Sequence, residues 1–182
     1  KPNTCIIGPR KHSKSIIVYA YLQYRLLQSK DRDNFEVLYI SFKKQLASYH
    51  IKKFKEFCEA NPVFSDLVDL KPEAESKAEY TWKGSNLTFT VEPTGINSFD
   101  RGRHPDLVIL DDVLKDPKDK LELGVIKSIN KTFREEITSL PKENGGEIKA
   151  VGTSQTKHDF MFTLRDKPSW SWGKYKAVPS WE

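Results

Sequence analysis

A run of residues near the amino terminus has the residue types of a phosphate-binding loop: Gly8, Pro9, Arg10, Lys11, His12, Ser13, Lys14 and Ser15. It follows the apolar run 4–7 and precedes an apolar-periodic run over 16–27, where a strand would pass into a helix. In loops of this type, backbone N–H groups and a helix N-terminus hold phosphates, while a lysine and a hydroxyl contact phosphate and Mg²⁺. The pattern therefore predicts a nucleotide-binding loop.

One position departs from the usual order of Gly, four residues, then Gly-Lys-Ser/Thr. Ser13 replaces the second glycine, and a Cβ there restricts the backbone dihedrals and the approach of the chain to phosphates. The alternative interpretation of this stretch is a basic turn that caps a helix, and the rest of the chain favours the phosphate loop.

Two adjacent carboxylates, Asp111 and Asp112, follow the four apolar residues 107–110. Such a run suits a strand buried on both faces of a parallel sheet, and open α/β sheets bind ligands at the carboxyl ends of their strands. Acids in that place can hold a hydrated Mg²⁺ and orient a water. The alternative is that they only cap the next helix or start a turn.

Two loops add further polar groups. Residues 95–104 are rich in turn formers and present Arg101 and Arg103, which in isolation would be interpreted as solvated arginines. Gly152 and Thr153 follow another strand-like run, 147–151. Their positions before and after the acidic strand make both loops candidates for the same site.

Length and composition describe a globular protein with a polar surface, since 37% of the 182 residues are hydrophobic and 30% are charged. This length predicts one domain, and no apolar stretch approaches the roughly 20 residues that cross a bilayer.

The net charge of +5 is compatible with a polyanionic partner without requiring one. Cys5 and Cys58 lack metal-site spacing and are interpreted as buried thiols in a reducing compartment.

The elements that must position these residues alternate between strands and helices. We expect strands over 4–7, 35–41, 107–110, 147–151 and 174–178, and a hairpin over 79–82 and 87–91. We expect helices over 16–27, 43–60, from Asp116 to Pro141, and 160–165. The pattern predicts an α/β protein with a mostly parallel central sheet flanked by helices.

Apolar residues at helical spacing support the three long helices. The first carries Ile17, Tyr21, Tyr24 and Leu27. The second carries Ala47, Ile51, Phe54 and Cys58, with lysines on its other side. The third carries a core stripe of Ile126, Ile129, Phe133, Ile137 and Leu140. Near the end, Trp170, Trp172 and Trp181 are expected to pack rather than to bind bases.

Together these pieces resemble the ATPase domain of the large terminase subunit, the DNA-packaging motor of tailed bacteriophages. Residues 9–15 are similar to the family's variant Walker A motif, which carries an early arginine. Residues 101–112 are similar to the family's Walker B motif and the arginine-bearing segment that precedes it. Gly152-Thr153, followed by 158–160, looks like its coupling motif. The resemblance covers almost the whole chain and implies one P-loop NTPase domain of RecA/ASCE type, a three-layer sandwich, over residues 1–182. Asp112 stands where many members carry Glu.

The resemblance implies that residues 8–15 wrap the triphosphate of ATP. Lys14 would contact the β and γ phosphates, and Arg10 would sense the γ-phosphate from within the subunit. Ser15 and Asp111 would hold Mg²⁺.

The remaining implied roles concern turnover and its coupling to DNA. Asp112 would polarise the hydrolytic water. Arg101 or Arg103 would be an arginine finger that reaches a neighbouring subunit's nucleotide, a charge worth orders of magnitude in phosphoryl transfer. Gly152 and Thr153 would report the nucleotide state to the part that grips DNA.

The family also implies a cargo, partners and a location. ATP hydrolysis would drive double-stranded DNA into a viral procapsid, at the portal vertex in the cytoplasm of the infected host cell. The partners would be the portal protein, the small terminase subunit and further copies of this chain in a ring, with no membrane. The chain begins with Lys1. We interpret it as a fragment without the family's C-terminal nuclease domain and expect no DNA cleavage.

Two other functions stay open at this point. One is another nucleic-acid translocase or helicase, although common helicases need a second RecA-like lobe for which this chain has no room. The other is a nucleotide-binding regulatory or structural module with little hydrolysis, which the departures at Ser13 and Asp112 favour. Lys52, Lys53 and Lys55 either contact DNA or form the solvated side of their helix.

Overall fold

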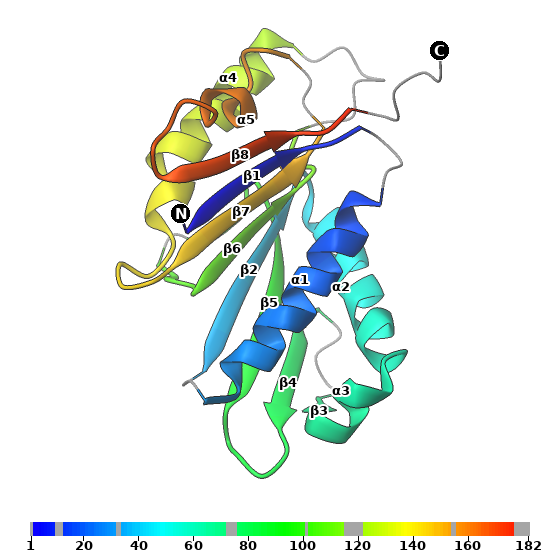
Figure 1. Ribbon diagram of the computed structural model, residues 1–182. Helices are drawn as coiled ribbons and strands as arrows, with labels where there is room; N and C mark the ends of the chain where they lie inside the picture. The colour runs from blue at the N-terminus through cyan, green and yellow to red at the C-terminus, as the bar shows by residue number, and fades with distance from the viewer. Residues whose placement is uncertain are drawn as a thin grey trace, which may run out of the picture.

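One sheet organises the chain in the computed structural model, which describes residues 2–9, 13–31, 34–71, 76–100, 102–114, 122–153 and 156–176. Its strands lie in the order β3-β4-β5-β2-β6-β7-β1-β8 (Figure 1). The parallel part contains β5 (Thr88–Gly95), β2 (Phe35–Ser41), β6 (Leu107–Asp111), β7 (Glu147–Gly152), β1 (Asn3–Ile7) and β8 (Trp170–Lys174). At one edge, β3 (Val68–Leu70) and β4 (Ala78–Trp82) pair antiparallel. The predicted α/β class with a mostly parallel sheet is confirmed.

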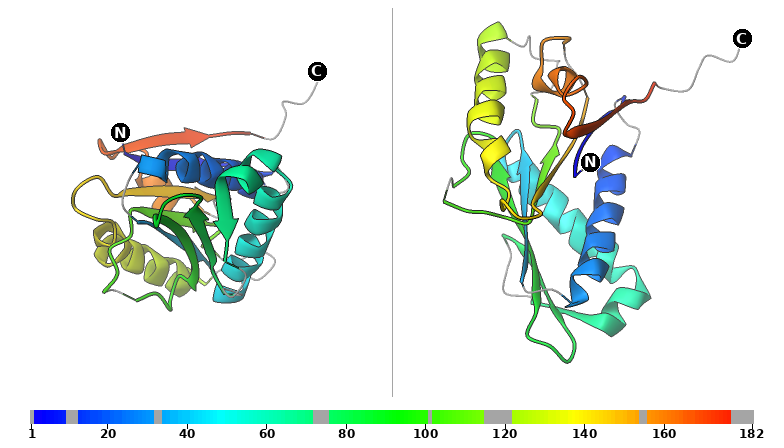
Figure 2. Two further views of the ribbon diagram at one scale, coloured as in Figure 1. Left: turned by 90° about the horizontal axis from the view of Figure 1, so that it is seen from below. Right: turned by 60° about the vertical axis from the view of Figure 1, so that its left-hand side comes forward.

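Helices cover both faces of this sheet (Figures 1 and 2). α1 (Lys14–Gln28) and α2 (Lys44–Glu59) pack on one face, where α3 (Pro62–Leu67) follows α2. α4 (Leu123–Glu135) and α5 (Phe160–Thr163) pack on the other face. Because β6 lies between these two layers, all five of its residues are buried.

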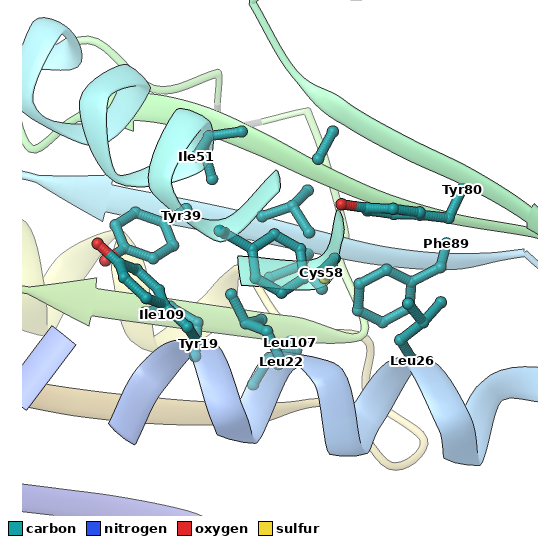
Figure 3. Close-up of a cluster of buried hydrophobic side chains, with 14 of the residues drawn as sticks. Tyr19, Leu22, Leu26, Tyr39, Ile51, Cys58, Tyr80, Phe89, Leu107 and Ile109 are labelled. Atoms are coloured by element: carbon teal, nitrogen blue, oxygen red, sulfur yellow. The ribbon is translucent and has the colours of Figure 1, made fainter. Parts of the chain in front are cut away.

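The packing of α1 differs from the predicted stripe. The helix itself is confirmed, but Ile17, Tyr24 and Leu27 are exposed, with relative exposures of 57%, 54% and 41%. The buried face consists of Lys14, Val18, Tyr19, Leu22, Gln23 and Leu26. Figure 3 shows Leu22 and Leu26 pointing from α1 into the core against the sheet.

The stripe predicted for the second helix is confirmed, because Ala47, Ile51, Phe54 and Cys58 are all buried on α2. All five residues of the third stripe, Ile126, Ile129, Phe133, Ile137 and Leu140, are buried too. The predicted span of that helix is wrong. The expected start at Asp116 lies outside the described residues, Glu122 has an extended backbone, and α4 begins at Leu123 and ends at Glu135. A short 3₁₀ helix, η2 (Ile137–Ser139), continues the stripe.

The sheet confirms one prediction and differs from another. The hairpin is confirmed as β4 and β5, and Gly84 adopts φ +80° in its turn. The last strand was expected over 174–178 but is β8 at Trp170–Lys174, beside β1. Trp170 is buried there, and Trp172 donates its Nε1–H to the Met161 carbonyl at 2.8 Å, so both pack as expected. Trp181 lies outside the described residues.

Both cysteines are free and buried. Burial raises the pKa of the Cys5 thiol to about 12, so this group stays protonated. No helix in the described ranges combines the length and apolar character needed to cross a membrane.

Candidate nucleotide-binding site

Three neighbouring parallel strands, β6, β7 and β1, end at the same edge of the sheet, and the predicted site residues follow them. Backbone hydrogen bonds tie the strand ends together: the Gly8 N–H donates to the Gly152 carbonyl at 3.0 Å, and the Asp112 N–H to the Val151 carbonyl at 3.0 Å. The loops after the three strands therefore start from one connected frame. Ligands bind at this kind of edge in open α/β sheets.

Lys14 is the first residue of α1 and is 9% exposed. Its ammonium donates to the Pro9 carbonyl at 2.9 Å and to the Thr153 Oγ1 at 3.0 Å, so the loop after β1 is joined to the loop after β7. At Gly8, an added Cβ would lie 3.1 Å from the Lys14 side chain. Gly8 thus allows the lysine to fold back along the loop.

Ser13 adopts the left-handed conformation, with φ 53° and ψ 25°, at the position where the usual pattern has glycine. Its carbonyl accepts the first hydrogen bonds of α1, from the Ile16 and Ile17 N–H groups at 3.0 and 3.3 Å. The chain thus adopts a glycine-like turn without glycine. Arg10, Lys11 and His12 lie outside the described residues.

Ser15 and Asp111 come together across 96 positions of sequence, with the Ser15 hydroxyl donating to the Asp111 Oδ2 at 3.0 Å. Asp111 is fully buried at the end of β6, and burial raises the pKa of its carboxyl group. Hydrogen bonds from Tyr39 and Ser15 act in the opposite direction by stabilising the anion.

The other Asp111 oxygen, Oδ1, is buried and has no hydrogen-bond partner among the described residues. A buried carboxylate oxygen without a donor is unfavourable unless a cation binds it. A serine hydroxyl can donate its proton and still offer an oxygen lone pair to a metal. Ser15 and Asp111 therefore fit Mg²⁺, which takes oxygen ligands and keeps several waters.

Asp112 also departs from ordinary backbone geometry, with φ 44°. Its Oδ1 accepts a hydrogen bond from the Thr153 N–H at 3.0 Å, which links the acid to the predicted coupling motif. It borders a cavity of about 360 Å³ together with Ser13, Lys14 and Ser15. The carboxylate thus faces the space beside the lysine and the serine.

Three residues that the sequence analysis missed surround Asp111: Tyr19 on α1, Tyr39 on β2 and His50 on α2. The Tyr39 hydroxyl donates to the Asp111 Oδ2 at 2.5 Å, and the Tyr19 hydroxyl lies 2.7 Å from the His50 Nδ1. Figure 3 shows the hydroxyls of Tyr19 and Tyr39 pointing toward the arrowhead ends of the strands. His50 is partly buried and lies beside the buried stripe of Ala47 and Ile51 on α2. A titratable residue next to an apolar stripe is the sequence feature that could have drawn attention to it.

Arg103 lies apart from this cluster. It forms an ion pair with Glu92 and borders a second cavity with Glu36 and Leu38. Leu38 belongs to the core under α4, whereas the Asp111 side chain bonds to Tyr39 on the α1 and α2 face. The sheet therefore separates Arg103 from the site of its own chain. Arg101 lies outside the described residues.

Solved structures share this fold. The HK97 bacteriophage large terminase aligns with 100% of this chain and 37% of its own, with a TM-score of 0.64 at 14% sequence identity. The large terminase of a thermophilic bacteriophage, in complex with ATP-gamma-S, aligns with 96% of this chain and 39% of its own, with a TM-score of 0.68 at 12% identity. The fold is that of a large terminase ATPase domain.

A third structure narrows the match to one part of these proteins. The large terminase ATPase domain of Thermus phage P74-26 aligns with 97% of this chain and 76% of its own, with a TM-score of 0.57 at 10% identity. The chain spans about 37–39% of the two large terminases named first. No protein-family profile and no curated protein sequence matches it. The likeness to large terminases therefore rests on the fold.

Proposed function

We propose that this chain binds ATP with Mg²⁺ at the loop of residues 8–15 and hydrolyses it, as the motor domain of a DNA-packaging terminase. The observation that carries the proposal is the contact between the Ser15 hydroxyl and the Asp111 carboxylate at 3.0 Å, beside Lys14 and Asp112. Phosphoryl transfer requires mainly positioning and charge neutralisation, and a lysine, a hydroxyl and two carboxylates supply both.

Each residue has a role that its position permits. Lys14 exchanges its contacts with Pro9 and Thr153 for the β and γ phosphates. Ser15 and the free Asp111 oxygen would hold Mg²⁺, which would neutralise phosphate charge. Asp112 orients the attacking water from the cavity wall.

Thr153 is the residue that links the nucleotide to the rest of the molecule in this proposal. Its hydroxyl accepts from Lys14 and its N–H donates to Asp112, so it contacts residues assigned to both phosphate and water. When Lys14 turns to phosphate, its contact with the Thr153 hydroxyl is lost, and the set of contacts that positions Thr153 at the end of β7 changes. In this proposal, ATP hydrolysis drives the translocation of double-stranded DNA into a procapsid. A ring of subunits carries this out on a portal protein, together with a small terminase subunit.

The test is steady-state ATP hydrolysis and nucleotide affinity, with and without double-stranded DNA. Lys14→Ala is expected to lose affinity and turnover together. Asp112→Asn is expected to keep affinity and to lose roughly 100-fold or more in turnover, the usual contribution of a general base. Lys131→Ala, which removes an exposed lysine of α4 on the other face of the sheet, is the matched control and is expected to behave as the wild type.

Each alternative has its own outcome. Wild-type behaviour of both Lys14→Ala and Asp112→Asn would show that residues 8–15 are not a phosphate loop. Binding of ATP without turnover, even in the assembled ring, would identify a nucleotide-binding module. If double-stranded DNA leaves the rate of ATP hydrolysis unchanged and the chain does not translocate DNA, the proposed packaging function is wrong.

A further inference from the structure

The environment of Asp111 contains more hydrogen-bond donors than a phosphate loop by itself provides. Tyr39 is fully buried on β2, His50 is nearly buried on α2, and Tyr19 comes from α1. Tyr39 bonds to Asp111 directly, the His50 ring faces it, and Tyr19 is linked to it only through His50. Placing polar groups in a core is unfavourable unless each is hydrogen-bonded, and here they form one network that ends at the Asp111 carboxylate.

Tyr39, Ser15 and His50 all approach the same oxygen of Asp111. The Tyr39 hydroxyl is 2.5 Å and the Ser15 hydroxyl 3.0 Å from the Asp111 Oδ2. The His50 Nε2 lies 3.9 Å from that same oxygen. Oδ1 has no partner among the described residues. The carboxylate is thus held by one oxygen and free at the other.

The histidine supports the same arrangement. Burial raises the pKa of Tyr19, so its hydroxyl keeps the proton and can donate it to the His50 Nδ1 at 2.7 Å. When Nδ1 accepts this hydrogen bond, the ring N–H is at Nε2, the nitrogen that faces Asp111. The ring also stacks on Tyr39, with centroids 5.9 Å apart and planes 27° apart. His50 therefore restrains Tyr39 as well as facing the carboxylate.

We propose that Tyr39 is a positioning residue of the metal site, which holds Asp111 by Oδ2 so that Oδ1 faces the cation. The inference deepens the proposed function and rests on it. A partner that orients a metal ligand typically contributes 10- to 100-fold to metal affinity. Through His50, the same arrangement makes α2 part of the frame around the metal.

The test measures metal-dependent nucleotide binding and does not depend on turnover. ATPγS affinity of the full chain is measured by calorimetry over a Mg²⁺ titration and in excess EDTA, and bound Mn²⁺ by electron paramagnetic resonance. Tyr39→Phe keeps the ring and removes the donor. The Mg²⁺ concentration for half-saturation is expected to rise about 10-fold, with affinity in EDTA unchanged.

Two further variants make the result specific. Tyr80→Phe removes the hydroxyl of another buried tyrosine, on β4, and is expected to leave the Mg²⁺ dependence unchanged. His50→Ala removes the ring that stacks on Tyr39 and is expected to give a smaller defect of the same kind. It provides a second measurement if Tyr39→Phe lowers the melting temperature too far.

The outcomes separate this inference from the proposed function. If the wild type requires Mg²⁺ for tight binding and both Tyr39→Phe and His50→Ala keep that requirement unchanged, the positioning role is wrong and the proposed function stands. Equal losses of ATPγS affinity in Mg²⁺ and in EDTA would also overturn the positioning role, because they indicate general structural damage. A wild type without Mg²⁺-dependent nucleotide binding would overturn both.

Discussion

Ser13 and Asp112 hold a left-handed backbone, with φ 53° and 44°, and both border the same cavity. Left-handed geometry costs an L-residue roughly 1–2 kcal/mol, and such residues collect at functional sites. At Ser13 the conformation turns the chain into α1. At Asp112 it turns the acid toward the loop after β7, where the Thr153 N–H binds it. The two conformations therefore serve the placement of the site residues.

Relief of this backbone cost is testable at Ser13. Ser13→Gly is expected to raise the free energy of unfolding by up to about 1 kcal/mol, because the relieved cost exceeds the added chain entropy of glycine. Ser13 makes no side-chain capping hydrogen bond, so little is lost with its hydroxyl. Urea unfolding measures the change. Ser13→Ala, which keeps the Cβ, should not gain stability, and a destabilised Ser13→Gly variant would contradict the explanation.

Among the elements, α1 shows how the site determines packing. Side chains four residues apart share a face of a helix, and Lys14, Val18, Leu22 and Leu26 are buried together on α1. Because Lys14 must face the loop after β7, this row turns toward the sheet. Of the predicted row, Ile17, Tyr24 and Leu27 then point outward, and Tyr21 packs half-buried against the core. The apolar stripe predicted for this helix rests on hydrophobicity alone and does not take the position of Lys14 into account.

Two leucines on that helix test its rotation. Leu22 is fully buried and Leu27 is 41% exposed. Leu22→Ala is expected to cost about 2–5 kcal/mol of unfolding free energy, and Leu27→Ala about 0.5 kcal/mol or less. Chemical denaturation of the two variants provides the comparison, in which each serves as the control for the other. Equal losses would mean that the assigned face of α1 is wrong.

Across the molecule as a whole, the sheet lies between Arg103 and the site. In register, Glu92 lies opposite Leu38, and Leu38 opposite Val108, three residues before Asp111. That spacing amounts to roughly 10 Å along the strand. If Arg103 is the arginine finger, this placement favours action on the nucleotide of a neighbouring subunit.

Mixing two variants tests this geometry. Arg103→Ala is expected to bind ATP normally and to lose roughly 10³-fold in the turnover of the assembled ring. Lys14→Ala keeps Arg103 but cannot bind the phosphates. Hydrolysis recovered in a mixture of the two would show action between subunits. Arg165→Ala removes an exposed arginine next to Asp166 and is the control. Full turnover by Arg103→Ala alone would exclude Arg103 as the finger.

The alternation of elements and the residue types of the site could be predicted from the amino-acid order, since both depend on short-range pattern. The runs at 35–41 and 107–110 became β2 and β6, and the second and third apolar stripes became core. The roles of the site residues stay predictions for the experiments above.

Features that depend on contacts between distant segments emerged only in the folded chain. The position of β8 follows from pairing with β1, and the rotation of α1 follows from the place of Lys14. Tyr39 and His50 could not be assigned from local pattern, because each looks like an ordinary core residue of its own element. Their target, Asp111, lies more than 60 positions away and is brought to them only when β2, β6 and α2 pack together.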